Sequence, residues 1–133
     1  TLDCCKHPSY QDLEGLRVSS HFFIDRSGRL FQYVSCLDRA WHAGVSSYEG
    51  RENCNDFSIG VELEGTDSAP YEQAQYETLG RLTDALAEAY PIKYVTGHSM
   101  IAPLRKTDPG PAFDWLTYES LCKTGKPLCF PYV

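Results

Sequence analysis

The segment from residue 56 to residue 65, which reads DFSIGVELEG, carries the clearest strand pattern in the chain. Successive side chains of a β-strand point to opposite faces, so its alternation predicts one apolar and one polar face. The apolar face must be covered by another element, and this requirement limits the possible folds. The polar face places two carboxylates, Glu62 and Glu64, beside Gly60.

The segments on either side of this strand predict a hairpin and a helix. Residues 19–25 and 30–35 are rich in aromatic and β-branched residues and flank a turn with a Ser-Gly pair, which is typical of a β-hairpin. Residues 71–90 repeat apolar side chains at steps of three and four, which indicates one stripe of a helix that ends at Pro91.

The second half of the chain is less regular. Residues 92–97 are a candidate short strand, the proline-rich stretch 98–111 predicts a long loop, and residues 113–123 predict a terminal helix. The tail at 122–133 is uninformative. Strands and helices mixed in this order predict an α/β or α+β fold, with a mixed central β-sheet flanked by helices.

Size and composition support a single domain over residues 1–133. Hydrophobic residues make up 42% of the 133, which is enough for a real core. The formal net charge of -6, without a basic stripe, argues against nucleic acid as a partner. No apolar run reaches the ~20 residues needed to cross a bilayer, so we expect no membrane partner. We also expect the protein to be a monomer. The spacing of the six cysteines favours mostly free thiols in a reducing compartment over a disulfide frame.

Several residues suit zinc-dependent hydrolysis, although each also has an ordinary structural explanation. His98 and Asp108 are zinc-binding residue types at the two ends of the proline-rich loop, but such a pair is more often a turn residue and a solvated charge. Lys106 suits an oxyanion stabiliser or a solvated lysine. Glu62 or Glu64 suits a general base or an exposed strand face, and alternation does not choose between them.

A tryptophan and a histidine follow one another at residues 39–44, which read RAWHAG. The small residues beside Trp41 would let a sugar or peptide approach the ring closely. Trp41 is nevertheless more often a core residue than a platform. His42 and His21 are more often hydrogen-bonded structural residues than ligands.

Three long strings resemble one known family. They are LRVSSHFFIDRSGRLFQYV, DRAWHAGVSSYEGRENCNDFSIGVELEGTD and TGHSMIAPLRKTDPGPAFDW, and the resemblance runs from about His7 to Trp115. The chain resembles the amidase-2 superfamily, which includes T7-type lysozymes and peptidoglycan recognition proteins. Within that superfamily it closely resembles the AmpD-type 1,6-anhydro-N-acetylmuramyl-L-alanine amidases.

This resemblance assigns roles to individual residues. It implies that His98 of TGH and Asp108 of RKTDPG are zinc ligands. It implies that Glu62, the first glutamate of ELEG, is the acid/base residue, and that Lys106 stabilises the transition state. The positions matched by three further residues line the family's substrate groove: Trp41, His21 and Arg17.

The resemblance also exposes two departures. The family's third zinc ligand is a histidine at the end of an early strand, in a VxHN-like context, and none of the four histidines matches it. We therefore expect the sequence to be incomplete at its N-terminus, and residues 1–133 alone to bind zinc weakly. In addition, Met100 and Leu104 stand where the related loop carries acidic residues, and the first change removes a group that could orient a ligand.

The resemblance implies an enzyme, an N-acetylmuramoyl-L-alanine amidase that uses Zn²⁺. Its substrate would be an anhydro-muropeptide or another peptidoglycan fragment, cut between the muramyl lactyl group and L-alanine during cell-wall recycling in the bacterial cytoplasm. The alternative is a muropeptide-binding module of the same superfamily that has no catalytic activity. The sequence does not distinguish anhydro-muramyl from muramyl substrates.

Overall fold

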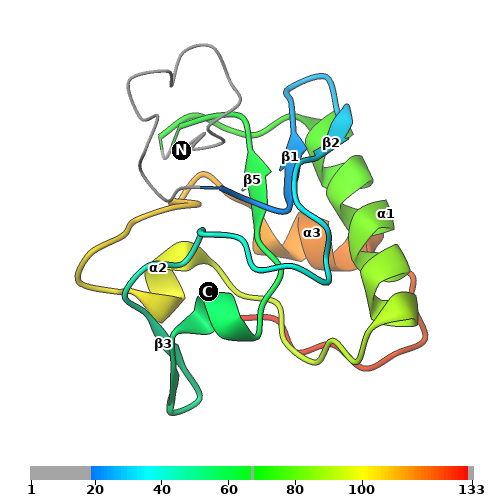
Figure 1. Cartoon of the computed structure of the whole chain (residues 1–133). Helices are drawn as coiled ribbons and strands as arrows, with labels where there is room; N and C mark the ends of the chain where they lie inside the picture. The colour runs from blue at the N-terminus through cyan, green and yellow to red at the C-terminus, as the bar shows by residue number, and fades with distance from the viewer. Residues whose placement is uncertain (1–18, 67, 132–133) are drawn as a thin grey trace.

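A three-stranded mixed sheet forms the centre of the molecule (Figure 1). The computed structural model describes residues 19–66 and 68–131. Strands β1 (Phe22–Ile24), β2 (Leu30–Gln32) and β5 (Val61–Leu63) lie in the order β2-β1-β5. The first two form the predicted antiparallel hairpin, and β5 runs parallel to β1. The expected mixed sheet with flanking helices is confirmed.

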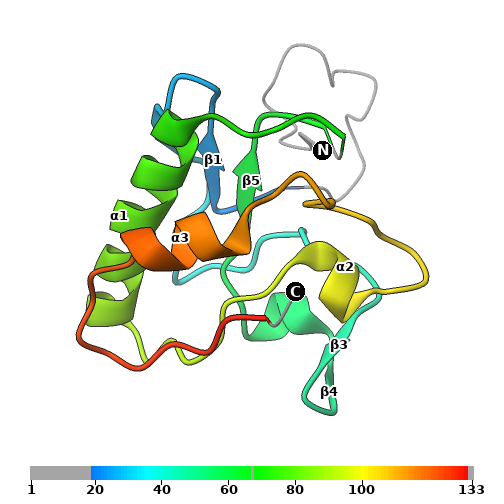
Figure 2. The same cartoon turned by 180° about the vertical axis from the view of Figure 1, so that it is seen from behind.

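Two helices cover one face of this sheet and enclose the main core. They are α1 (Gln73–Ala89) and α3 (Trp115–Leu121), which lies across α1 in Figures 1 and 2. The predicted apolar stripe is confirmed, because its side chains pack against the sheet and α3. The buried core consists of Phe22, Ile24, Tyr76, Leu79, Leu82, Phe113, Trp115 and Tyr118.

Polar side chains fix where both helices begin. Glu72 and Gln75 form a capping box at the start of α1. The fully buried Gln75 amide also donates to the carbonyls of Ile24, at 3.4 Å, and Glu64, at 2.9 Å, which ties the helix to the ends of β1 and β5. Asp114 caps α3 by accepting hydrogen bonds from the next turn.

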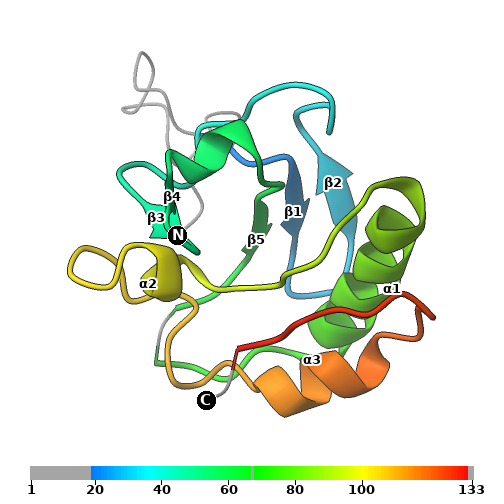
Figure 3. The same ribbon diagram turned by 90° about the horizontal axis from the view of Figure 1, so that it is seen from below.

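A smaller unit lies beside β5, on the side away from β2 (Figure 3). It contains the two-stranded ribbon of β3 (Ser47–Tyr48) and β4 (Arg51–Glu52), the 3-10 helix η2 (Cys54–Asp56) and the one-turn helix α2 (His98–Ile101). A second cluster of buried apolar residues, Ala43, Cys54 and Ile101, holds these pieces together. No helix within the described ranges is both long and apolar enough to span a bilayer.

Three predicted segments differ from the structure. The strand predicted at 56–65 is shorter, because η2 precedes it and the Ser58 hydroxyl donates to the Cys54 carbonyl at 2.6 Å, which folds the chain back. Within the described residues, the predicted strand at 92–97 is reduced to one bridge, between Tyr94 and Cys129. The loop at 98–111 begins with α2 before its prolines exclude further helix.

Candidate functional site

Glu62 lies on β5, where the sheet meets a cavity of about 600 Å³. Its neighbours Val61 and Leu63 pack against the main core, so the strand's alternation turns Glu62 to the other side. The same cavity is lined by His42, His98 and Asp108. The structure therefore brings three of the predicted site residues, from β5, α2 and the following loop, to one place.

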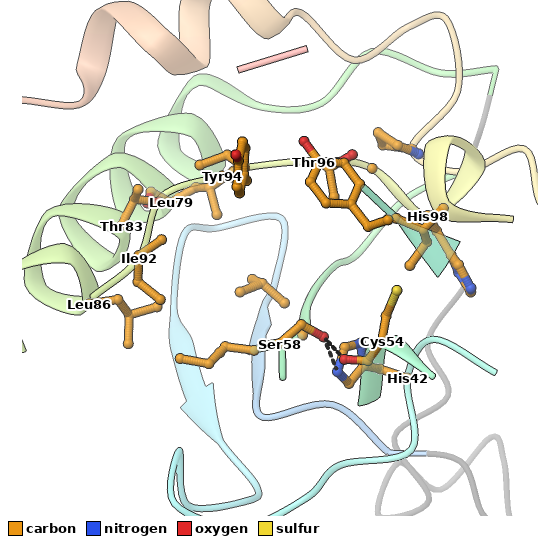
Figure 4. A pocket seen from close by; sticks show the side chains of 18 of the residues that line it. His42, Cys54, Ser58, Leu79, Thr83, Leu86, Ile92, Tyr94, Thr96 and His98 are labelled. Atoms are coloured by element: carbon orange, nitrogen blue, oxygen red, sulfur yellow. Dashed lines mark hydrogen bonds between the residues drawn. The ribbon is translucent and has the colours of Figure 1, made fainter. Parts of the chain in front are cut away.

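The cavity has two chemically different ends (Figure 4). His42, Ser58 and His98 lie at one end, whereas Leu79, Leu86 and Ile92 lie at the other. The apolar end is continuous with the main core. Candidate chemistry is therefore confined to the polar end.

The second carboxylate of the strand, Glu64, is used differently. Its Oε1 accepts a hydrogen bond from the backbone N–H of Arg26 at 2.8 Å, which holds the hairpin turn against β5. Glu64 is not among the residues that line the cavity, whereas Glu62 is. The geometry thus separates two carboxylates that the sequence pattern left equivalent.

Backbone contacts hold His98 and Asp108 close together. His98 begins α2, and the N–H of Ser99 donates to the Asp108 carbonyl at 2.8 Å. A side chain at Gly97 would approach Pro109 Cδ to 2.8 Å, so the glycine of the TGH string allows the loop to close. As a result, His98 Nδ1 lies 3.2 Å from Asp108 Oδ2.

Hydrogen bonding defines which nitrogen of His98 is available. Its Nε2 lies 3.0 Å from the Ala43 carbonyl oxygen, which can only accept, so Nε2 carries the proton. Nδ1 faces Asp108 Oδ2, and its protonation decides whether it donates to this oxygen or presents a lone pair beside it. Burial raises the pKa of the Asp108 carboxyl, but its hydrogen bond to His98 and the charge of that ring lower it more. The net shift is downward, and the carboxylate is ionised at neutral pH.

Two lone-pair atoms at this separation suit a shared metal ion. Ligands bound to zinc at about 2.0–2.1 Å in tetrahedral geometry lie roughly 3.3 Å apart, close to the 3.2 Å between His98 Nδ1 and Asp108 Oδ2. The pair fits two corners of such a site. Across residues 19–66 and 68–131, no group of three or more His, Cys, Asp or Glu residues is placed to hold a metal.

His42 is a neutral neighbour of this pair. Burial, followed by the charge of His21, lowers the pKa of His42 to about 4. Its Nε2 lies 3.3 Å from the Ser58 hydroxyl, whose own proton is donated to the Cys54 carbonyl, so Nε2 of His42 is the donor. A side chain at Gly60 would come within 2.4 Å of the His42 ring, so only glycine fits beneath it.

Three other predicted site residues, Lys106, Trp41 and His21, are not among the residues that line the cavity. Lys106 is half-buried two residues before Asp108, and its Nζ has no hydrogen bond or ion pair to the described part of the chain. Trp41 is 37% exposed, with the Arg39 guanidinium 4.4 Å above its ring. His21 is 1% exposed, and both its nitrogens bond to backbone, at Gly60 and Asp38. Arg17 lies outside the described residues.

Sequence reasoning missed the groups that hold the site together. The Ala43 carbonyl, Asn55 and Arg105 all contact the backbone or side chains around His98. No residue-type pattern marks them. Each nevertheless falls within a string that carries the family resemblance: RAWHAGVS, CNDFSIGVELEGTD or RKTDPG.

The fold and this set of side chains together define a class, an α+β protein with donors suited to metal-dependent hydrolysis. The chain belongs to the N-acetylmuramoyl-L-alanine amidase family (Amidase_2), whose family model matches residues 1–111.

Close relatives agree with this assignment. The chain is 56% identical over 123 residues to the 1,6-anhydro-N-acetylmuramyl-L-alanine amidase AmpD of Escherichia coli K12, covering 91% of the chain and 67% of that protein. It therefore spans about two thirds of the relative's length. A crystal structure of a selenomethionine AmpD derivative matches with a TM-score of 0.78 and 55% identity, over 86% of this chain and 65% of that one.

A more distant solved relative contains a substrate. It is the N-acetylmuramyl-L-alanine amidase AmiD of E. coli, in complex with anhydro-N-acetylmuramic acid-L-Ala-D-γ-Glu-L-Lys. The match has a TM-score of 0.76 and 37% identity, and it covers 85% of this chain and 51% of that one.

Proposed function

We propose that this protein hydrolyses the amide bond between the lactyl group of 1,6-anhydro-N-acetylmuramic acid and L-alanine in muropeptides. The observation that carries the proposal is that Glu62, His98 and Asp108 all line a single cavity, in which His98 Nδ1 lies 3.2 Å from Asp108 Oδ2. The family membership and the AmpD and AmiD relatives support the substrate class.

His98 and Asp108 would supply two protein ligands of a zinc ion. When bound, zinc lowers the pKa of water toward ~7 and polarises a carbonyl oxygen. The ionised Asp108 is in the form that binds a cation, and the contact of His98 Nε2 with the Ala43 carbonyl leaves Nδ1 as the nitrogen that would bind the metal. The family resemblance implies that the third ligand is a histidine of an early strand.

Glu62 and Lys106 would carry the proton and charge transfers. Glu62 lines the same cavity as His98 and Asp108, so its carboxylate would take the proton from the attacking water and return one to the departing L-alanine amine. The Lys106 ammonium, close to Asp108 in the chain, would stabilise the negative oxygen that forms on the carbonyl.

The substrate-groove residues and the cellular context complete the proposal. Trp41 and Arg17 would line the groove, Trp41 with a 37% exposed ring that carries the Arg39 guanidinium over one face. The third predicted groove residue, His21, is buried and bonds to backbone through both nitrogens, so it would not contact the substrate. The reaction would belong to peptidoglycan recycling, with the protein acting as a monomer. Its proposed place is the cytoplasm, and the four described cysteines, which are all free, support a reducing compartment.

A second candidate is a muropeptide-binding module without catalysis. It is favoured by one observation: only two metal-binding side chains meet among the described residues. A binding module releases no peptide and needs no general base. Changes at Glu62 would therefore have no catalytic effect in such a protein.

The test compares two matched variants, Glu62→Gln and Glu64→Gln. We expect Glu62→Gln to reduce release of stem peptide from an anhydro-muropeptide by about 10²–10⁴-fold with zinc content unchanged, because a general base is lost but no ligand. Glu64→Gln keeps an oxygen that can accept from Arg26, so it should cost little. If Glu64→Gln is the more damaging change, the carboxylate has been misassigned. If the protein binds zinc and the anhydro-muropeptide, yet neither the unmodified protein nor the variants release peptide, the protein is a binding module.

A further inference from the structure

The orientation of His98 depends on a group far away in the sequence. The Ala43 carbonyl, 55 residues earlier in the chain, accepts from His98 Nε2 at 3.0 Å. Metal-binding histidines commonly donate their second N–H to a carboxylate or a carbonyl, which fixes the tautomer and the ring angle. Here the partner is a backbone carbonyl of a fully buried residue, so its position is as fixed as the peptide that carries it.

The same carbonyl oxygen is held by Arg105. Nη2 of Arg105 donates to the Ala43 carbonyl at 2.7 Å and to the Val45 carbonyl at 3.0 Å. A carbonyl oxygen has two lone pairs, so it accepts from His98 and Arg105 at once. Between the two carbonyls, Gly44 has φ +62, and a side chain there would come within 2.7 Å of Arg105 Nη2. The turn at 43–45 is therefore wrapped around the guanidinium.

The backbone N–H of Ala43 is held by Asn55. Its Oδ1 accepts from the N–H of Ala43 at 2.8 Å and from the N–H of His42 at 3.1 Å. Asn55 is buried, and Arg105 closes the arrangement from the solvent side. The backbone of Ala43 is thus fixed both at its N–H and at the carbonyl oxygen that faces His98.

We propose that Arg105 is a positioning residue for the metal-binding pair: by clamping the Ala43 carbonyl it holds His98 in the Nε2-protonated form, with Nδ1 directed toward Asp108. This inference rests on the proposed zinc site. The positive charge of Arg105 is not its useful property, because a cation nearby opposes metal binding, and its exposure weakens that opposition through screening. Its useful property is the Nη2 amino group, whose two N–H bonds reach the two carbonyls together.

The two possible roles of Arg105, charge and positioning, predict opposite changes in zinc affinity when its side chain is removed, which makes the proposal testable. If Arg105 acts only through its charge, Arg105→Ala raises zinc affinity. If it positions His98, Arg105→Ala lowers zinc affinity by about 10–100-fold, the range typical of groups that orient a ligand. Arg105→Lys keeps the charge but replaces the planar Nη2 group with a mobile ammonium on a different stem, so we expect an intermediate loss. Arg81→Ala is the matched control, because Arg81 is exposed on α1 and outside the cavity lining.

The experiment measures zinc affinity by chelator competition in the full chain, together with the ¹H–¹⁵N NMR signal of the His98 Nε2–H that is hydrogen-bonded to Ala43. We expect Arg105→Ala to bind zinc more weakly and to lose this hydrogen-bonded Nε2–H signal, with a thermal unfolding curve close to that of Arg81→Ala. Unchanged affinity with the Nε2–H form retained overturns the proposal. If the unmodified protein shows the Nε2–H form but binds no zinc, the zinc site fails instead. A variant too unstable to measure is replaced by Arg105→Lys, for which the same outcomes apply.

Discussion

The helix-covered sheet and the loop that carries His98 and Asp108 are held together in different ways. In the sheet layer, rings and aliphatic side chains pack in one continuous core, in which Ile24 has no exposed surface. Around the site, a small number of specific hydrogen bonds, such as those to the Ala43 carbonyl, set each side chain. Many interchangeable contacts support the first region and few irreplaceable ones the second. Substitutions should therefore damage stability in one region and chemistry in the other.

The largest stability effect is expected from Ile24→Ala. Truncating a fully buried isoleucine leaves a cavity, and the free energy of unfolding should fall by about 4 kcal/mol, toward the upper end of such changes. The matched control is Leu30→Ala, since Leu30 pairs with Ile24 across the hairpin but is 44% exposed. It should cost roughly 1 kcal/mol or less. Denaturant unfolding measures both, and equal losses would contradict the core assignment.

The complementary change in the site is Lys106→Ala. Removing a single oxyanion-stabilising donor should lower kcat by about 10²-fold, equivalent to ~2.7 kcal/mol, with little change in KM or in unfolding free energy. Steady-state kinetics on an anhydro-muropeptide separates the two constants. A raised KM with normal kcat would instead assign Lys106 to binding a substrate carboxylate and would blur the contrast between the two regions.

The same contrast explains what the sequence could predict. The stripe on α1 and the hairpin at 19–35 were recognisable, because burial of a repeating face leaves a periodic pattern. The strand predicted at 56–65 was too long, because one hydroxyl contact, from Ser58 to the Cys54 carbonyl, keeps the chain folded back before β5 begins. A single hydrogen bond leaves no periodic pattern in the sequence, so periodicity could not predict it.

The site itself was predictable only as a set of residue types. Alternation could not separate Glu62 from Glu64, because the difference arises from a hydrogen bond to Arg26 in another strand's turn. The contact between His98 and the Ala43 carbonyl involves no side chain of residue 43, so no residue type marks it. Family resemblance selected His98, Asp108 and Glu62, and their meeting at one cavity agrees with that selection.

The central claim is that His98 and Asp108 bind the same metal ion. Its most direct test is zinc affinity, measured by chelator competition, for the unmodified chain and for His98→Ala, Asp108→Ala and Glu62→Gln. We expect each ligand change to weaken zinc binding by more than about 100-fold, because each ligand adds binding energy and fixes the other's geometry. Glu62→Gln should stay within about threefold of the unmodified chain, because Glu62 is assigned to proton transfer. Zinc retained by Asp108→Ala, or lost from Glu62→Gln, would contradict the account.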